Sequence, residues 1–140
     1  EIARHAERLG FDALLAPLPI YFSLKFSSVL AHYRRIADEV SLPIIYYHFP
    51  EVTRLDLTAK ELARLFEIES IIGIKESIFN LRTVKEHIGA IGRDAMIFSG
   101  TTLLLRPVMR MGGCGCICPI PNLIPETSSW NHTSSALHFL

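Results

Sequence analysis

The sequence predicts a parallel α/β fold, because short apolar segments alternate with segments of helical periodicity along most of its 140 residues. The apolar segments are bounded by residues that break regular structure, and such runs are typical of buried strands. Strands that are separated by helices pair in parallel through crossover connections. Two architectures meet this description: an open doubly wound sheet and part of a (β/α)8 barrel.

The first predicted elements follow this alternation. Residues 1–9 have apolar side chains at helical spacing, and Gly10 can end that helix. Residues 12–16 are a short apolar run closed by proline, which predicts a strand. Residues 27–40 repeat apolar side chains with the 3.6-residue period of an amphipathic helix. Residues 43–47 form the clearest strand, and a proline ends it.

The same order continues toward the end of the chain. Thr58 and Glu61 have the spacing of a capping box, which would open a helix running to about residue 66. Asn80 can cap the helix after the third strand. The remaining expected strands cover residues 71–75, 95–99 and 115–118, and the remaining expected helices cover residues 81–91 and 102–111.

The number of predicted units bounds the domain organisation. A complete barrel needs eight units and about 250 residues, whereas this sequence supplies five strands. No Gly-x-Gly-x-x-Gly or Gly-x-x-x-x-Gly-Lys loop follows a predicted strand, which argues against a nucleotide-binding sheet. Residues 126–140 are rich in Ser and Thr and lack periodicity. We therefore expect a partial barrel over residues 1–125 and an atypical tail over residues 126–140.

Composition excludes several classes of protein. Apolar residues make up 49% of the chain, and Lys+Arg and Asp+Glu balance at 14 each. A neutral chain lacks the basic excess that nucleic-acid and anionic-membrane surfaces need, and no apolar run approaches the roughly 20 residues of a spanning helix. The three cysteines all lie within residues 114–118, which favours a reducing compartment. We expect a cytoplasmic protein that binds neither nucleic acid nor membranes.

Reactive groups gather at the carboxyl ends of the strands in parallel α/β folds, and the third predicted strand ends in Lys75. Burial disfavours the charged form of a lysine. A neutral lysine acts as a base or attacks a carbonyl to form a Schiff base. The structural alternative is a lysine that extends to solvent or pairs with Glu76.

The second predicted strand ends in two tyrosines and a histidine. Alternation places Tyr47 and Tyr46 on opposite faces, so that one phenol can relay protons inside the sheet while the other packs under helices. An aromatic that fills the core is the alternative for Tyr47, and a structural role is favoured for His48. The cysteines are expected to be small buried strand residues and not metal ligands. The sequence also places three histidines in predicted helices without an evident ligand cluster, namely His5, His32 and His87.

Taken in order, these strand ends resemble the dihydrodipicolinate synthase / N-acetylneuraminate lyase family. Its members are (β/α)8 barrels that bind pyruvate, or a pyruvate-derived 2-oxo acid, as a Schiff base. The matching segments are residues 44–50 (IIYYHFP), 71–77 (IIGIKES), 98–100 (FSG) and 112–117 (GGCGCI). The resemblance implies an incomplete (β/α)8 barrel of about five units, from the third helix to the eighth strand.

The resemblance also implies roles for individual residues. It assigns Lys75 as the Schiff-base lysine and Tyr47 as the phenol that shuttles protons. Tyr21 matches a tyrosine that reaches into a neighbouring subunit's site. Ile117 matches a position whose backbone contacts the bound pyruvate, and Gly100 is expected in the same substrate site. No cofactor or metal is implied, because the lysine supplies the electrophile, and a homodimer or homotetramer is expected.

Two departures from the family pattern bear on activity. The sequence lacks the Gly-Thr-Thr-Gly-Glu loop that holds the pyruvate carboxylate, and Val52 replaces an arginine of the synthase branch, with Arg54 two residues further on. We expect a Schiff-base lyase or aldolase of 2-oxo acids, and Val52 favours a catabolic 2-oxo acid aldolase or a relative of another activity over dihydrodipicolinate synthesis. The alternatives are a truncated barrel remnant without activity and a phosphate-binding isomerase.

Overall fold

The computed structural model describes residues 1–92 and 94–124. Its helices are α1 (Ile2–Arg8), α2 (Phe26–Ala37), α3 (Pro50–Thr53), α4 (Ala59–Leu65), α5 (Leu81–Ile91) and α6 (Leu105–Arg110). Its strands are β1 (Leu14–Pro17), β2 (Ile44–His48), β3 (Ile71–Glu76), β4 (Met96–Ser99) and β5 (Gly115–Cys116). The predicted tail over residues 126–140 lies outside the described residues.

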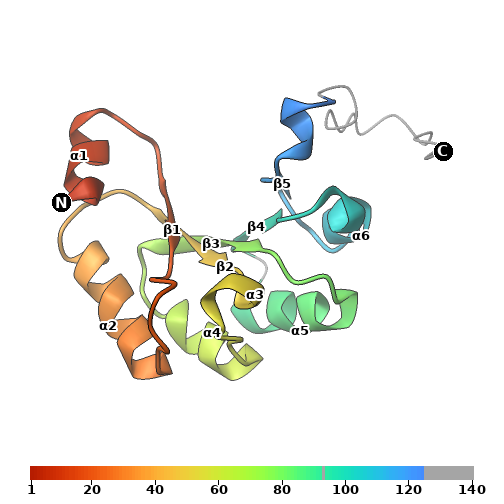
Figure 1. Cartoon of the computed structure of the whole chain (residues 1–140), viewed down its shortest axis with the longest axis horizontal. Coiled ribbons are helices and arrows are strands. Elements are labelled where there is room, and N and C mark those ends of the chain that lie inside the picture. The colour runs from red at the N-terminus through yellow and green to blue at the C-terminus, as the bar shows by residue number, and fades with distance from the viewer. Residues whose placement is uncertain (93, 125–140) are drawn as a thin grey trace.

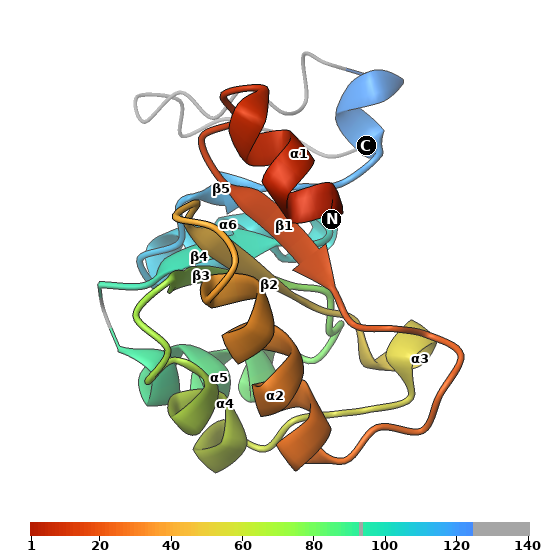
Figure 2. The ribbon, with the colours of Figure 1, turned by 90° about the vertical axis from the view of Figure 1, so that its left-hand side faces the viewer.

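The described strands form one parallel sheet in the order β1-β2-β3-β4-β5. Each crossover therefore moves one strand further in the same direction, and α2, α4 and α5 lie together on one side of the sheet (Figures 1 and 2). A doubly wound sheet would reverse its strand order and carry helices on both faces. The arrangement is that of consecutive units of an incomplete barrel, which confirms the predicted fold class.

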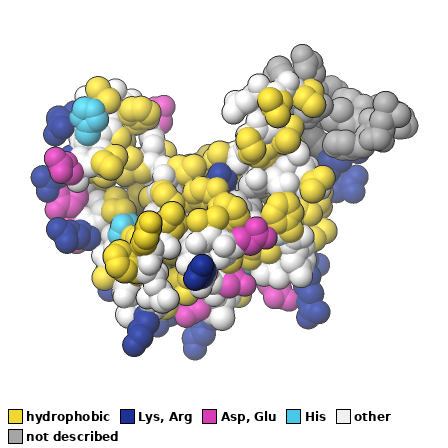
Figure 3. Space-filling model, in the orientation of Figure 1, with side chains coloured by type: hydrophobic (Ala, Val, Ile, Leu, Met, Phe, Trp, Pro, Cys, Tyr) yellow, Lys and Arg dark blue, Asp and Glu magenta, His cyan; other side chains and the backbone are white. Residues whose placement is uncertain are grey.

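The core lies between the sheet and this helical layer. Alternate residues of the central strands, such as Ile44, Tyr46 and Ile74, pack with residues of the helices, such as Leu62 and Val84. The opposite face of the sheet is open. Figure 3 shows a hollow lined by hydrophobic side chains on this side of the molecule. The sheet consequently has one closed face and one accessible face.

Local signals explain where several elements begin. The Thr58 side chain accepts from the backbone N–H of Glu61, and the Glu61 carboxylate accepts from Thr58, so the predicted capping box is formed. The Asn80 side chain caps α5 by accepting from the N–H groups of Arg82 and Thr83. No helix in the described ranges combines the length and the apolar character that a membrane crossing requires.

Two predicted elements differ in extent in the structure, and one short helix was not predicted. The helix expected over residues 102–111 begins as a 3-10 turn (Thr102–Leu104) before α6, because Pro107 has no N–H for a regular bond to the preceding turn. The short α3, which starts at a proline, was not expected. The last strand ends at Cys116 and not at residue 118.

Candidate active site

The carboxyl ends of β2, β3 and β4 bring the candidate residues side by side. Tyr47 pairs with Lys75, and Lys75 pairs with Phe98 on the other side. Residues that pair across parallel strands project to the same face. Lys75 therefore stands in the central strand of the sheet, flanked by Tyr47 and Phe98 on the open face.

Lys75 and Tyr47 are in direct contact. The Nζ atom of Lys75 lies 3.7 Å from the centroid of the Tyr47 ring, within the range of a cation–π interaction. The Tyr47 ring is held in turn by stacking on Phe49, with centroids 5.8 Å apart and planes 11° apart. Only 9% of the Lys75 surface is exposed. The predicted amine and phenol are thus neighbours in a largely dry setting.

Glu76, the residue after Lys75 in β3, is held by a cluster of side chains on the closed face of the sheet. The Glu76 carboxylate lies 3.0 Å (Oε1) from Nδ1 of His48 and 2.8 Å (Oε2) from Nδ1 of His87, and all three side chains are buried. The backbone N–H of Ile78 also donates to Oε1 at 3.1 Å. Burial by itself would raise the pKa of Glu76, but the two imidazole hydrogen bonds and the histidine charges outweigh burial and hold it below its usual range.

This His48–Glu76–His87 cluster corrects the expectation that His87 belongs to no group of possible ligands. The donor atoms of the three residues lie within 4.8 Å of one another, and two imidazoles with a carboxylate are a donor set that zinc accepts. An ionised carboxylate can only accept, so both Nδ1 atoms carry protons that they donate to Glu76. The expectation that the chain holds no metal stays a prediction.

Part of the His48–Glu76–His87 cluster could have been predicted from the alternation of side chains along the strands. His48 lies on the same face of β2 as Tyr46 and pairs in register with Glu76. The pairing was predictable once the strands were known to be neighbours. The contribution of His87 depends on how α5 rotates against the sheet, and no local pattern reports that rotation.

Gly100 is required by a close approach of two loops. Its N–H donates to the carbonyl of Glu76 at 2.7 Å. A Cβ at this position would lie 2.1 Å from Oγ of Ser77 and 2.9 Å from the Glu76 carbonyl oxygen, so a larger residue would push the β3 and β4 ends apart. Ile117 follows β5 directly and donates its N–H to the Ser99 carbonyl at 2.9 Å. Both residues therefore lie at the strand ends, and their substrate contacts stay predictions.

The cysteines are less buried than predicted. Cys114 is exposed, and Cys116 and Cys118 are half-buried. Burial and a hydrogen bond with Cys118 raise the pKa of Cys116 to about 12, although the charge of Lys75 acts in the opposite direction. A thiol with this pKa stays protonated, which disfavours Cys116 as a nucleophile.

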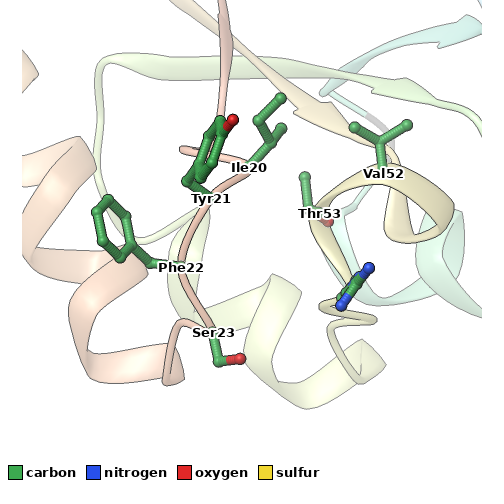
Figure 4. Close-up of a pocket in the computed structure, with 7 residues that line it drawn as sticks. Ile20, Tyr21, Phe22, Ser23, Val52 and Thr53 are labelled. Carbon is green, nitrogen blue, oxygen red and sulfur yellow. The ribbon is translucent and has the colours of Figure 1, made fainter.

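Tyr21 lies apart from the Lys75–Tyr47 pair, in the loop between β1 and α2. Its side chain is 91% exposed and lines a pocket of about 300 Å³ together with Val52 and Arg54. Figure 4 shows Ile20 and Tyr21 on one side of this pocket and Val52 and Thr53 on the other. Its exposure leaves Tyr21 accessible to a second subunit, and that role stays a prediction.

Comparisons with known proteins agree on one group. A model of the dihydrodipicolinate synthetase family matches residues 1–130. The chain is 33% identical over 129 residues to the 4-hydroxy-tetrahydrodipicolinate synthase of Rhodopseudomonas palustris (strain BisA53), covering 92% of this chain and 44% of that relative. It is 35% identical over 125 residues to the enzyme of the same name from Archaeoglobus fulgidus, covering 89% of this chain and 43% of the relative.

Solved structures give the same result. The crystal structure of YagE, a prophage protein of the dihydrodipicolinic acid synthase family from E. coli K12 in complex with pyruvate, superimposes with a TM-score of 0.86 at 27% identity, over 91% of this chain and 44% of that one. CdNal from Clostridium difficile in complex with mannosamine gives 0.81 at 27% identity, over 87% and 42%. The chain thus spans less than half the length of the relatives that it matches.

Proposed function

The chain belongs to the dihydrodipicolinate synthetase family, and on that premise we propose that it supplies the Schiff-base machinery of a pyruvate-dependent lyase or aldolase. The observation that carries the proposal is the contact between the Lys75 amine and the Tyr47 ring at the carboxyl end of the central strand. The pyruvate bound in the related YagE structure supports the substrate class.

The chemistry follows from the amine. Neutral Lys75 attacks the 2-oxo carbonyl, and loss of water gives a protonated imine. That imine withdraws electrons from the adjacent carbon, so a carbon–carbon bond there can form with an aldehyde or break to release one. The product leaves when water hydrolyses the imine and regenerates the amine.

Tyr47 acts as the proton carrier in this scheme. Its backbone pairs with Lys75 and its ring contacts the amine, so its hydroxyl belongs to the same small site. A positioned phenol transfers protons to and from the carbonyl oxygen as the imine forms. Gly100 and Ile117, at the ends of β4 and β5, would form the far wall of this site and offer backbone groups to the 2-oxo acid.

The proposed enzyme differs from a dihydrodipicolinate synthase in its choice of aldehyde. Val52 stands where the synthase pattern has an arginine, and its apolar side chain is exposed in the pocket beside Tyr21. An apolar group cannot bind a carboxylate at that point. We therefore assign the protein to a branch that cleaves or forms other 2-oxo acids, working in the cytoplasm as a homodimer or homotetramer.

Borohydride trapping tests the proposal. The protein at its native length is incubated with pyruvate and sodium borohydride, which reduces the imine to a stable amine, and peptide mass spectrometry locates the adduct. We expect the adduct on Lys75, its loss in Lys75→Arg, and its retention in the matched control Lys85→Arg, which alters an exposed lysine of α5. An adduct on a different lysine would refute the role of Lys75, and the absence of any adduct would refute the mechanism and favour a barrel remnant without activity.

A further inference from the structure

The His48–Glu76–His87 cluster lies on the closed face of the sheet and takes no part in the proposed reaction. Lys75 projects to the open face, and Glu76, the next residue of β3, projects to the other. The exposed fraction is 0% for His48, 3% for Glu76 and 4% for His87. Three side chains of the kinds that ligate metals are therefore gathered in a dry place, and the proposed mechanism does not use them.

The donor atoms of the cluster have nearly the spacing of a metal site. Zinc with nitrogen and oxygen ligands at about 2.0–2.1 Å in a tetrahedron holds its ligand atoms about 3.3 Å apart. Nδ1 of His48 lies 3.0 and 3.2 Å from the two Glu76 oxygens, and Nδ1 of His87 lies 2.8 Å from Oε2. The three donor atoms, one from each residue, lie within 4.8 Å of one another. A small outward shift of the side chains would admit an ion between them.

The other nitrogen of His48 faces a second carboxylate. Oδ1 of Asp56 lies 3.6 Å from Nε2 of His48. In the metal-free cluster, the proton of a neutral His48 is on Nδ1, so Nε2 turns a lone pair toward Asp56, and its hydrogen bond from the Leu57 N–H is long at 3.5 Å. A metal on Nδ1 would move the proton to Nε2, which can then donate to Asp56. Metal-bound histidines commonly donate their second N–H to a carboxylate in this way.

A buried hydroxyl beside the cluster has no hydrogen-bond partner within the described residues. This hydroxyl belongs to Tyr46, which is fully buried and whose ring centroid lies 5.5 Å from that of His48. Burial is the main cause that raises the pKa of Tyr46, and the charges of neighbours that include Glu76 and Asp56 add to it. The hydroxyl is thus within electrostatic reach of the cluster. A water molecule that completes the coordination of an ion would supply the missing partner.

From these observations we infer that His48, Glu76 and His87 bind one zinc ion. Two imidazoles and a carboxylate form a donor set that zinc takes in proteins. Both imidazoles stay neutral when their protons move to Nε2, and the two charges of Glu76 and Asp56 balance the ion. The zinc would join β2, β3 and α5 behind the strand end that carries Lys75, without contact to the substrate. The inference stands against the sequence-based expectation of no metal and does not depend on the proposed Schiff-base function.

Metal loading during refolding tests the inference, because binding to a buried site is coupled to folding. The protein at its native length is unfolded in urea with EDTA, dialysed, refolded with or without zinc sulfate, and desalted before elemental analysis. We expect one zinc per chain and an unfolding midpoint that zinc raises by several degrees. Competition with a chromophoric chelator gives the Kd. We expect His87→Gln to raise this Kd at least about 100-fold, and Asp56→Asn to raise it by about 10- to 100-fold.

Two controls separate this site from other zinc ligands of the chain. His5→Gln removes an exposed histidine of α1 and should leave the Kd within about twofold. Cobalt in place of zinc reports the ligand type, because thiolates of residues 114–118 would add charge-transfer absorption in the near ultraviolet, which we expect to be absent.

The Asp56 side chain is 63% exposed, so Asp56→Asn should fold even where His87→Gln does not. Less than one zinc per chain, an unchanged Kd in Asp56→Asn and in any folded His87→Gln, or cobalt bound through thiolates would overturn the zinc site. The pyruvate adduct that tests the proposed function is measured independently of each of these outcomes.

Discussion

Consecutive residues of β3 serve the two faces of the sheet in opposite ways. Lys75 projects to the open face, where its amine lies against the Tyr47 ring. Glu76 projects to the closed face, where two histidines donate to its carboxylate. Strand alternation alone separates these two environments.

The difference indicates how the site is built. The contacts of Glu76 tie β3 to His48 of β2, to His87 of α5 and to the backbone of the following loop. These bonds hold the end of the strand from behind. The open face is left to Lys75, and in the proposed mechanism its flexible side chain moves from the tyrosine ring to a substrate carbonyl. Under this proposal one face supplies rigidity and the other supplies reactivity.

The largest effect is expected for Glu76→Ala, which tests whether the closed face depends on the Glu76 cluster. It would leave two buried imidazole N–H groups without an acceptor, and the loss of a buried partner of this kind costs about 3–5 kcal/mol. Urea denaturation of the protein at its native length measures the change. The control Glu67→Ala removes an exposed carboxylate and should cost less than about 0.5 kcal/mol. A loss below about 1 kcal/mol for Glu76→Ala would show that the closed face does not depend on this cluster.

The open face is tested by Tyr47→Phe. Removal of the hydroxyl should slow turnover by about 10²-fold, the lower end of what general acid–base groups contribute. Stability should hardly change, because the ring keeps its stacking on Phe49. Steady-state kinetics and urea denaturation give the two values. An unaltered rate would remove Tyr47 from the mechanism.

A fall in pH perturbs the closed face more gently than truncation does. The hydrogen bonds from His48 and His87 keep the pKa of Glu76 below its ordinary value even though burial opposes them. A carboxyl whose pKa is lower in the folded state stabilises the fold above its unfolded pKa of about 4.3. That stability is lost as the pH falls through the folded pKa.

Chemical denaturation between pH 7 and pH 3 measures this loss. Wild type should lose stability below about pH 4.5, and Glu76→Gln should show a flatter profile, because glutamine does not titrate. Hydrogen bonds lower the pKa of Glu7 and Glu39 as well, but these residues are exposed and salt screens such contributions. Parallel profiles for the two proteins would assign the acid sensitivity to groups other than Glu76.

The sequence predicted the sheet better than it predicted the site. Buried strands such as residues 43–47 have strong local signals, since an apolar run between prolines has few other structures available to it. The opposite orientations of Tyr46 and Tyr47 followed from alternation, and their burial confirms it. The Asn80 cap was predictable for the same reason, because the cap interaction lies within one turn.

The remaining features depend on contacts between distant segments. His87 reaches Glu76 only because α5 packs on the sheet with one particular face. The left-handed backbone of Arg54 occurs where α3 ends and the chain turns toward α4, and no residue type in the sequence predicted it. The pocket beside Tyr21 needs residues 20–23 and 52–54 together, which are separated by a whole helix and strand. Such features require the tertiary structure.

The smallest effect is expected for Tyr46→Phe. It compares the two faces directly, because Tyr46 and Tyr47 are adjacent in β2 and the same substitution is made on each. Tyr46 is fully buried, and burial raises the pKa of its hydroxyl, which stays neutral. That hydroxyl has no hydrogen-bond partner among the described residues. Its ring meets the Tyr33 ring edge to face, with centroids 5.5 Å apart.

Tyr46→Phe keeps the ring contact and removes the unpaired hydroxyl. We expect it to leave stability unchanged or to raise it by up to about 1 kcal/mol, since an unsatisfied buried polar group is unfavourable. It should also leave pyruvate trapping intact, whereas Tyr47→Phe slows turnover at nearly constant stability. Urea denaturation and borohydride trapping on both variants decide the matter. A Tyr46→Phe variant that is less stable by more than about 1 kcal/mol would mean that this hydroxyl forms a stabilising hydrogen bond on the closed face of the sheet.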